Sequence, residues 1–522
     1  MATVLERVSE FKNEPILDFK DPANKQKMET ALADVRKTFG TTYDLIINGQ
    51  RVRGEGTFPS RNPSKPSEIV GTLQKATKGQ AREAVVAAEQ AFLTWSRVPA
   101  SERADLLFKA AAEVRRRRFE FDALLVLEVG KSWPEADGDV SEGIDFLEYY
   151  AREMLRLAGP HPVTPVHGEK NAMLYIPLGV GVVIPPWNFA FAIMVGMTSA
   201  AIVAGNTVVL KPSSDSPVIA YKFVELLEHA GMPPGVVNLL TGSGSEIGDL
   251  LVEHPRVRFI SFTGSKDVGL RVNQLAATPQ PGQLWIKRVV AEMGGKDSIV
   301  VAADADLDAA VEGVAVSAFG FQGQKCSACS RAIVEAPIYD EFVKRLAQRV
   351  KTMRVGDPAD PANYMGPVVN EGSRDKIESY IEEGKKEGTL VAGGARAPGE
   401  GYFLEPTVIA DVKPDAKIAQ EEIFGPVLAV IKAKDYSDAL RIANNTEFGL
   451  TGAVYSKDAG KLARAQDEFH VGNLYFNRKC TGALVGAHPF GGFNMSGTDS
   501  KAGGPDYLLL FLQAKSVSEK VG

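Results

Sequence analysis

Cysteine and histidine are scarce in this chain. Its 522 residues include only three cysteines and six histidines. Three thiols, two of them at positions 326 and 329, cannot build a disulfide framework, and reduced thiols fit a cytoplasmic location. The run Cys326-Ser327-Ala328-Cys329 has no second Cys or His pair nearby to complete a zinc site. We therefore expect no metal.

The chain also lacks a membrane-spanning run and an excess of positive charge. The longest apolar stretch, residues 189–204, is shorter than a membrane span and contains Thr198 and Ser199, so we predict a buried helix. The N-terminus has an acid by residue six and no apolar segment, unlike a secretory signal. A net charge of −6 does not favour nucleic acid. These features predict a small-molecule substrate, with no nucleic-acid or membrane partner.

Strand-like and helical runs alternate from about residue 171. Four consecutive strand–helix pairs predict a mostly parallel sheet with helices on both faces, which is an α/β fold. The pairs are 180–184 with 190–204, 207–211 with 216–230, 236–240 with 245–253, and 257–262 with 265–276. A second series begins near residue 298 and continues through 306–319, 332–335 and 339–350. We place a domain boundary near residue 293.

The two ends of the chain differ from this central pattern. Residues 1 to about 45 are predicted to form polar helices on the surface, followed by a hairpin at 43–52 with Asn-Gly as its turn. Residues 80–95 and 101–129 have helical periodicity, and the four arginines at 115–118 are expected on a solvated or interface face. The tail at 507–518 alternates weakly, which is consistent with a strand added to a partner.

Cys326 lies in a polar, Gly-rich run, residues 320–327, directly after an apolar helical pattern. A thiol in this setting is well placed to be a nucleophile, provided that a neighbouring group lowers its pKa or takes its proton. The alternative is a small apolar residue that happens to be cysteine. Glu292 ends an apolar strand and precedes two glycines. It is the candidate base, with a capping or lysine-paired carboxylate as the alternative.

Glycine and polar residues follow the ends of the predicted parallel strands, where such sheets bind ligands. The run Gly242, Gly244, Gly248 resembles a dinucleotide fingerprint with its last gap one residue too long. Its expected role depends on its place at a helix N-terminus, which favours an anion. Lys211 ends the second strand and is expected to contact a ribose or phosphate oxygen; a solvated surface lysine is the alternative.

Five runs, in this order, resemble the aldehyde dehydrogenase superfamily. They are Pro185-Pro186-Trp187-Asn188, Phe262-Thr263-Gly264-Ser265, Glu292-Met293-Gly294-Gly295, Gly323-Gln324-Lys325-Cys326 and Glu421-Glu422-Ile423-Phe424-Gly425-Pro426. The resemblance covers roughly residues 40 to 515. It implies a Rossmann-like NAD-binding domain (1–151 and 172–292), a second α/β catalytic domain (293–488) and small β oligomerisation segments (152–171 and 489–522), in a homodimer or higher oligomer.

The same resemblance implies a role for each matching residue. Cys326 would attack the aldehyde, Asn188 and the backbone N–H of Cys326 would hold the oxyanion, and Glu292 would activate water to hydrolyse the thioester. Glu422 and Phe424 would contact the nicotinamide ribose, and Lys211 the adenosine ribose. The other residues expected to bind the cofactor are Ile184, Pro185, Pro186, Trp187, Ser213, Ser214, Gly244, Gly248, Thr263, Gly264, Ser265, Met293 and Gly294.

One position bears on the choice of cofactor. NAD-preferring members often have Glu where this chain has Ser214. A carboxylate there would repel the 2′-phosphate of NADP, whereas a hydroxyl would not. NAD is the predicted cofactor, and NADP use is left open.

The runs at 324–331 and 477–483 further resemble the branch that oxidises L-glutamate γ-semialdehyde (1-pyrroline-5-carboxylate) to glutamate, the second step of proline degradation. By that resemblance Ser327, Gly482 and Ala483 hold the amino-acid head group, while Phe189 and Phe490 flank the aliphatic chain. One alternative is another NAD(P)-dependent aldehyde or semialdehyde dehydrogenase. The other is a catalytically silent binding protein, although a retired site would be free to lose Asn188, Glu292 and Cys326.

Overall fold

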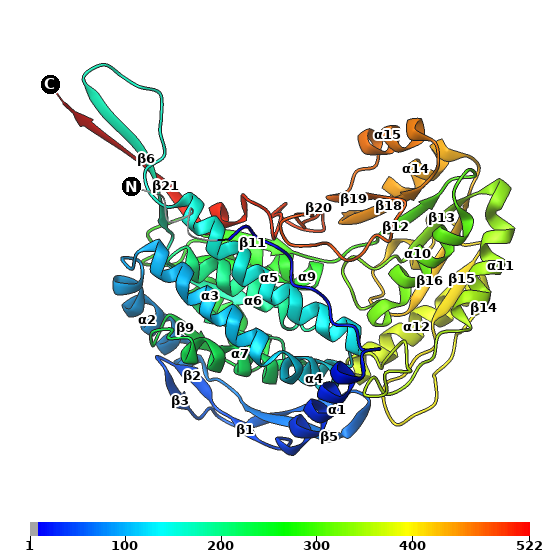
Figure 1. The fold of residues 1–522 in the computed structure, drawn as a ribbon, viewed down its shortest axis with the longest axis horizontal. Helices are drawn as coiled ribbons and strands as arrows, with labels where there is room; N and C mark the ends of the chain where they lie inside the picture. The colour runs from blue at the N-terminus through cyan, green and yellow to red at the C-terminus, as the bar shows by residue number, and fades with distance from the viewer. Residues whose placement is uncertain (1–8, 522) are drawn as a thin grey trace.

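Two seven-stranded sheets form the two halves of the molecule (Figure 1). This computed structural model describes residues 9–521. Residues 1–8, which belong to the segment predicted as polar helices, and Gly522, at the end of the C-terminal segment, lie outside the described residues. The predicted α/β class with two strand–helix series is confirmed.

The first sheet has five parallel strands and a hairpin at one edge. In spatial order its strands are β11 (Arg288–Glu292), β10 (Val257–Thr263), β7 (Val180–Ile184), β8 (Thr207–Leu210), β9 (Val237–Leu239), β2 (Leu45–Ile47) and β3 (Gln50–Val52). The β2–β3 turn is Asn48-Gly49, as predicted. Both residues have positive φ, 52° and 73°, which a two-residue hairpin turn requires and which Asn and Gly tolerate.

Alternate residues of these strands pack on opposite faces. Val183 and Val208 belong to one apolar cluster, and Val182 and Val209 belong to another. Because side chains alternate along a strand, strands buried on both sides are continuous apolar runs. The helices on the first face include α6 (Ala192–Val203) and α7 (Pro217–His229). Those on the other are α2 (Lys78–Trp95), α8 (Asp249–Glu253) and α9 (Lys266–Ala277).

The second sheet has one antiparallel edge strand, β14, and six parallel strands. Its order is β14 (Thr389–Ala392), β15 (Thr407–Ala410), β16 (Val427–Ala433), β13 (Arg331–Glu335), β12 (Ser298–Val301), β18 (Thr451–Tyr455) and β19 (Asn473–Phe476). Helices α10 (Leu307–Phe319) and α11 (Tyr339–Val350) pack on one face. On the other lie α12 (Glu371–Glu387), α13 (Lys417–Gln420), α14 (Tyr436–Asn444) and α15 (Ala459–Glu468).

The N-terminal helices differ from their predicted bounds. The 101–129 pattern is two helices, α3 (Ala100–Arg116) and α4 (Arg118–Val129), because Arg117 leaves the helical conformation at ψ 16°. They pack beside α5 (Trp133–Leu157). In the described part of the segment predicted as polar helices, residues 9–45, the one helix is α1 (Pro22–Lys37), and residues 9–21 cross the surface without regular structure. The apolar stretch at 189–204 contains α6 and is buried, as predicted.

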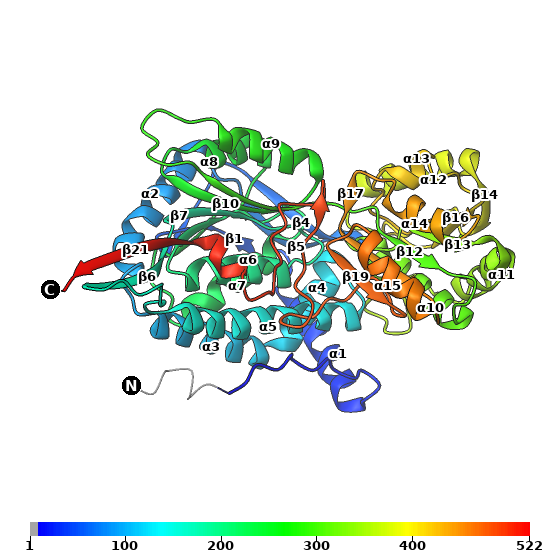
Figure 2. The ribbon, with the colours of Figure 1, turned by 90° about the horizontal axis from the view of Figure 1, so that it is seen from above.

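The C-terminal tail forms a strand, but its partner lies in the same chain. β21 (Leu512–Lys520) pairs antiparallel with β6 (Glu169–Pro177) along their whole length. Together they project from the molecule as an arm with the C-terminus at its tip (Figures 1 and 2). The arm is narrower than the segments 152–171 and 489–522 delimited from the sequence, since residues 152–157 complete α5 and the 3-10 turn Tyr507–Phe511 packs in the core of the first half.

Smaller elements complete the structure. β1 (Thr42–Tyr43), β5 (Lys65–Gln74) and β4 (Thr57–Asn62) form a three-stranded sheet. β17 (Phe448–Gly449) pairs with β20 (Phe493–Asn494). Among residues 9–521, no helix has the length and apolar character needed to cross a membrane.

Candidate active site

The loop that carries Cys326 follows α10 and belongs to the second half. It begins with Phe321, Gln322 and Gly323, which all have positive φ, at 48°, 57° and 66°. Two consecutive non-glycine residues in this region are unfavourable and persist only where surrounding contacts fix them. At Gly323 a Cβ would come within 2.4 Å of the Gly425 carbonyl oxygen, so only glycine fits.

The Gln322 side chain supplies those contacts. Its Nε2 donates to the carbonyls of Gly130 at 3.0 Å and Pro367 at 2.8 Å, and its Oε1 accepts from the backbone N–H of Gly366 at 3.0 Å. A buried amide whose N–H groups and oxygen are all hydrogen-bonded holds the segments that it joins in fixed positions. The loop is therefore held in one conformation before any ligand arrives.

Cys326 lies at the junction of two pockets. One is a cleft along the ends of the first sheet's strands, and the other is a more apolar cavity beside α5 and α6. Thr263 and Met293 line both pockets, as Cys326 does. The thiol comes from the second half and reaches the cleft built by the first half, so both halves contribute to the site.

Asn188 contacts the same loop. It follows β7, is 4% exposed, and donates from Nδ2 to the carbonyl of Gln324 at 3.1 Å. Gln324 in turn accepts from the backbone N–H of Val369 at 2.9 Å through its Oε1. A carboxamide has two N–H groups, and this bond uses one of them. The Asn188 amide is thus hydrogen-bonded to the loop at Gln324, two residues before Cys326.

The surroundings of Cys326 do not stabilise a thiolate. Burial raises the pKa of the thiol well above its usual value, and the carboxylates of Asp297, Glu422 and Glu292 raise it further. The Cys326 thiol needs a group that lowers this pKa or takes its proton. The net effect of its protein neighbours is to raise the pKa, so a base that takes the proton is required.

Glu292 has the properties of such a base. It ends β11 and lines the apolar cavity. Burial raises its pKa to about 7, although the hydroxyl of Ser500 donates to Oε1 and the N–H of Gly492 donates to Oε2 at 3.4 Å. A carboxyl group that titrates near neutral pH is suited to proton transfer.

Most residues predicted to bind the cofactor line the cleft. They are Ile184, Pro185, Pro186, Trp187, Lys211, Ser213, Thr263, Gly264, Ser265, Met293, Gly294, Glu422 and Phe424. Ser214, Gly244 and Gly248 are not among the lining residues; Gly244–Gly248 is a single π-helical turn before α8. Six further lining residues were not assigned to the cofactor from the sequence: Pro212, Phe262, Val268, Ile423, Ser373 and Lys376, of which the last two come from the distant helix α12.

Two contacts shape the cleft. Glu422 accepts from the backbone N–H of Gly295 at 3.1 Å, and a Cβ at Gly294 would lie 2.3 Å from the Glu422 carboxylate, so the glycine allows this close approach. Lys211 is 5% exposed, and burial lowers its pKa to about 8. Its ammonium donates to the carbonyl of Pro212 at 3.3 Å. A lysine buried at a strand end beside a polar cleft is suited to bind an anionic or hydroxyl-rich ligand.

The apolar cavity contains all five residues predicted to hold the substrate: Phe189, Ser327, Gly482, Ala483 and Phe490. Other residues that line this cavity were not predicted from the sequence. These are Glu142, Phe146 and Tyr150 on α5, Ile193, Gly196 and Met197 on or beside α6, and Ala502 and Tyr507 near the C-terminus. Helical periodicity marked α6 as buried, but no local signal distinguishes a cavity wall from core packing. Among residues 9–521, no group of His, Cys, Asp or Glu side chains has the arrangement of a metal site.

Comparison with known proteins gives the same family that the motifs indicate. The aldehyde dehydrogenase family model matches residues 51–517. A 1-pyrroline-5-carboxylate dehydrogenase from Geobacillus thermodenitrificans is 58% identical over 512 residues, which cover 98% of this chain and 99% of that protein.

Solved structures agree. A 1-pyrroline-5-carboxylate dehydrogenase from Thermus with bound NAD is 53% identical with a TM-score of 0.97, covering 98% of this chain and 99% of that one. A betaine aldehyde dehydrogenase from Staphylococcus aureus in complex with NAD+ is 30% identical with a TM-score of 0.88, covering 95% and 98%. This chain therefore belongs to the aldehyde dehydrogenase family.

Proposed function

We propose that this protein oxidises L-glutamate γ-semialdehyde, in equilibrium with 1-pyrroline-5-carboxylate, to L-glutamate with NAD, as the second step of proline degradation. The observation that carries the proposal is the position of Cys326. Cys326 lines both the cleft suited to a dinucleotide and the apolar cavity suited to an aldehyde. A nucleophile at this junction can hold the substrate carbon next to a hydride acceptor.

The cleft at the strand ends fits NAD. Backbone groups of Pro185, Gly264 and Gly294, the Lys211 ammonium and the Glu422 carboxylate are the groups available to hold it. When bound, NAD accepts the hydride released from the substrate carbon. Ser214 adds no negative charge near the cleft, so we also expect measurable turnover with NADP.

The residues of the chain supply the covalent chemistry. The Cys326 sulfur forms a bond to the aldehyde carbon, its proton leaves to Glu292 directly or through water, and the substrate oxygen becomes an oxyanion. Asn188 Nδ2 and the Cys326 N–H are the donors proposed to hold that oxyanion. After hydride loss the product is a thioester on Cys326. Glu292, after it has released the thiol proton to solvent, takes a proton from water and the water oxygen attacks the thioester. The carbon–sulfur bond then breaks to release glutamate, and the Cys326 thiolate is reprotonated.

The cavity supports a substrate with an amino-acid head group. Gly482 has a φ of 76°, and within residues 9–521 the N–H groups of Gly482 and Ala483 donate to no protein acceptor. Adjacent free N–H groups in such a turn are suited to a carboxylate. Phe189 and Phe490 line the same cavity as these groups and Cys326, and we propose that they flank the aliphatic chain of the substrate. The Geobacillus and Thermus relatives, both 1-pyrroline-5-carboxylate dehydrogenases, support the same substrate.

Assembly into a homodimer or larger homo-oligomer is also part of the proposal. The β6–β21 arm projects from the molecule, and Val517 on it is 40% exposed. Its outer edges can add strands from a second copy, which would cover the unpaired backbone groups. All three cysteines are free, which supports a reducing compartment such as the cytoplasm.

The test is a comparison of substrates on the purified protein. We expect kcat/KM to be highest for glutamate γ-semialdehyde, lower for succinic semialdehyde and lowest for propanal, with NAD as the acceptor. NADP is measured in parallel. A preference for propanal would remove the substrate assignment while leaving the aldehyde dehydrogenase chemistry in place. Loss of all three activities in Cys326→Ala would support the nucleophile, and unchanged activity would exclude it.

A further inference from the structure

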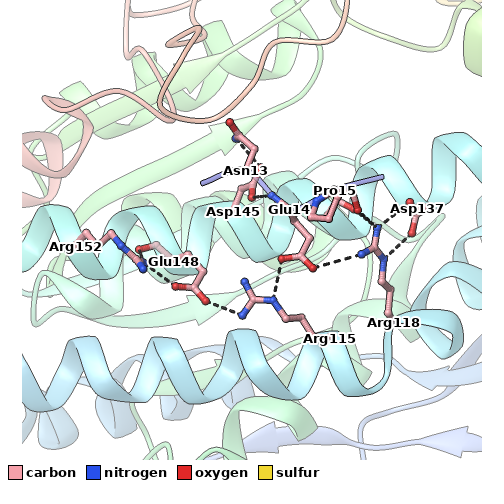
Figure 3. Close-up of polar contacts among 10 residues, drawn as sticks. Asn13, Glu14, Pro15, Arg115, Arg118, Asp137, Asp145, Glu148 and Arg152 are labelled. Atoms are coloured by element: carbon pink, nitrogen blue, oxygen red, sulfur yellow. Dashed lines mark hydrogen bonds and ion pairs between the residues drawn. The ribbon is translucent and has the colours of Figure 1, made fainter. Parts of the chain in front are cut away.

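Residues 9–17 form a strap that crosses α5 on the outside of the molecule, on the way to α1 (Figures 1 and 3). It lies ahead of the part of the chain matched by the family model, which begins at residue 51. The strap is attached by polar contacts to α3, α4 and α5. The contacts of the strap therefore indicate how it affects the active site.

Most of these contacts fix the strap to the helices alone. The Glu14 carboxylate accepts from Arg115 Nε at 2.8 Å, and Arg118 donates to the Pro15 carbonyl at 2.8 Å (Figure 3). Asp137, which is fully buried, accepts from the Leu17 N–H at 2.7 Å and pairs with Arg118. Two arginines of the run at 115–118, Arg115 and Arg118, therefore pair with acids of the chain itself.

Asn13 makes a different kind of contact. Its Nδ2 donates both to Asp145 Oδ2 on α5, at 2.8 Å, and to the carbonyl of Val485, at 3.0 Å. The Glu14 N–H donates to the other Asp145 oxygen at 2.6 Å. Burial raises the pKa of Asp145 to about 6, so the carboxylate is charged at neutral pH and its hydrogen bonds are charge-assisted. The Asn13 amide thus links Asp145 on α5 to the loop that contains Val485, which lies 472 residues after Asn13 in the sequence.

That loop is the one that lines the substrate cavity. We call residues 480–488 the anchor loop, because it contains Gly482 and Ala483. Val485 is two residues beyond Ala483 and 4% exposed. The next residue, Gly486, has a φ of 79°, and a Cβ there would lie 3.1 Å from the Phe11 ring and 3.2 Å from the Tyr149 ring. The strap therefore closes the outer side of the anchor loop at two successive residues.

Helix α5 contacts the strap with one face and lines the substrate cavity with the other. Asp145 and Tyr149 face the strap, whereas Glu142, Phe146 and Tyr150 line the cavity. Tyr150 also accepts from the N–H of Gly503 at 2.8 Å, and Gly503 accepts from the N–H of Gly486. The anchor loop is thus held between α5 on its inner side and Asn13 on its outer side.

We propose that Asn13 is a positioning residue for substrate specificity: it fixes the Val485 carbonyl, and thereby sets where the Gly482 and Ala483 N–H groups meet the head group of the substrate. This inference rests on the proposed function, because only a substrate with an amino-acid head group uses the anchor loop. Asn13 does not line the cavity and acts only through Val485. A small aldehyde without a head group needs the thiol but not the loop.

The experiment compares Asn13→Ala with Arg115→Ala. Both variants loosen the strap, but Arg115 holds it to Glu14 and makes no contact with the anchor loop. One lost hydrogen bond corresponds to about a 3- to 10-fold change in binding. For Asn13→Ala we expect KM for glutamate γ-semialdehyde and the inhibition constant for the product, glutamate, to rise by about that factor. We expect kcat, and kcat/KM for propanal, to stay within about twofold.

Arg115→Ala should leave the ratio of the two substrates unchanged, and Asn13→Gln, which retains the amide, should recover part of the loss. Phe11→Ala provides a second disturbance of the loop, at Gly486, and should raise the glutamate inhibition constant as well. Circular dichroism checks that each variant is folded. An equal fall in kcat/KM for both substrates in Asn13→Ala would overturn the proposal. An unchanged glutamate inhibition constant in both Asn13→Ala and Phe11→Ala would also overturn it. A wild-type preference for propanal would instead overturn the proposed function, so the two failures are distinguishable.

Discussion

The ammonium of Lys131 lies 3.1 Å from Asp139 Oδ2, and neither side chain is exposed to solvent. The same ammonium lies 4.3 Å from the ring centroids of both Phe189 and Phe321. Phe189 lines the substrate cavity, and Phe321 begins the strained loop that carries the nucleophile. One buried cation thus contacts two parts of the active site, and desolvated cation–π contacts are worth about 2 kcal/mol.

Lys131→Met tests this arrangement through stability. The substitution leaves the Asp139 carboxylate buried, with the N–H of Ala192 at 2.7 Å as a remaining donor. Removing one partner of a buried ion pair typically costs about 3–5 kcal/mol. We expect the free energy of unfolding, measured by urea denaturation, to fall by that amount.

The double variant Lys131→Met/Asp139→Asn is the control. It removes both charges, so most of the loss should be recovered. Lys386→Met breaks a solvent-exposed pair with Glu383, 2.8 Å apart on α12, and should cause no measurable change. Equal stability of Lys131→Met and the wild type would mean that the pair contributes nothing.

Glu292 predicts a pH dependence. Its pKa is raised to about 7, and it acts as a base only when deprotonated. The deprotonated fraction rises from about one tenth at pH 6 to about nine tenths at pH 8. If thioester hydrolysis limits turnover, kcat should therefore rise about tenfold between these pH values. Steady-state rates with saturating NAD and substrate measure this.

Glu292→Gln is the matched variant, because it keeps the size of the side chain and removes the base. We expect a burst of reduced nicotinamide followed by slow turnover with no inflection near pH 7. Full steady-state turnover without a burst would assign water activation to another group.

Lys211 predicts a second pH effect, this time on cofactor binding. Burial lowers its pKa to about 8, so the ammonium loses its charge as the pH rises through that value. A bound anionic or hydroxyl-rich ligand favours the charged form. The dissociation constant for NAD should therefore be flat below pH 8 and increase above it. Fluorescence titration of the protein with NAD measures the constant.

Lys211→Met should bind NAD more weakly at pH 7 and lose the increase above pH 8. A nearby lysine provides the comparison: Lys376 also lines the cleft, and its ammonium donates to the Glu422 carbonyl at 3.3 Å. Lys376→Met leaves Lys211 in place and should retain the increase. Identical profiles for Lys211→Met and the wild type would show that Lys211 does not contact the cofactor.

The sequence predicted the parts of the site that depend on local patterns. Strand ends are marked by apolar runs followed by Gly, Pro or polar residues, and this placed Asn188, Lys211 and Thr263 along one cleft. Cys326 was distinguished by its polar, Gly-rich setting. The tail was predicted to be a strand, and this is confirmed. Alternation does not show which strand a segment joins: β21 pairs with β6 of the same chain, and addition to a second copy stays a prediction.

Features that depend on contacts distant in sequence could not be predicted in the same way. Glu142 and Tyr150 line the cavity from the middle of α5, where helical periodicity indicates only a buried face. Asn13 meets Val485 across almost the whole chain. Gly242, Gly244 and Gly248 resembled a fingerprint with its last gap one residue too long; residues Gly244–Gly248 form a π-helical turn and are not among the residues that line the cleft.

Asn188 gives the most direct test of the catalytic centre. Removing one preformed donor to an oxyanion typically lowers kcat by about 100- to 1000-fold. Asn188→Ala should show this loss in the hydride-transfer step, which is measured in a single turnover by the absorbance of reduced nicotinamide.

Asn188 also donates to the Gln324 carbonyl at 3.1 Å, so displacement of the loop is a second way in which the variant can lose activity. Asn188→Leu approximately keeps the size of the side chain and removes the donor without adding a charge, and it should lose as much activity. Titration with a thiol reagent separates the two causes: an unchanged rate of Cys326 alkylation in both variants means that the loop has not moved, and the loss then belongs to the oxyanion. Alkylation altered in proportion to kcat would assign the effect to the position of the thiol.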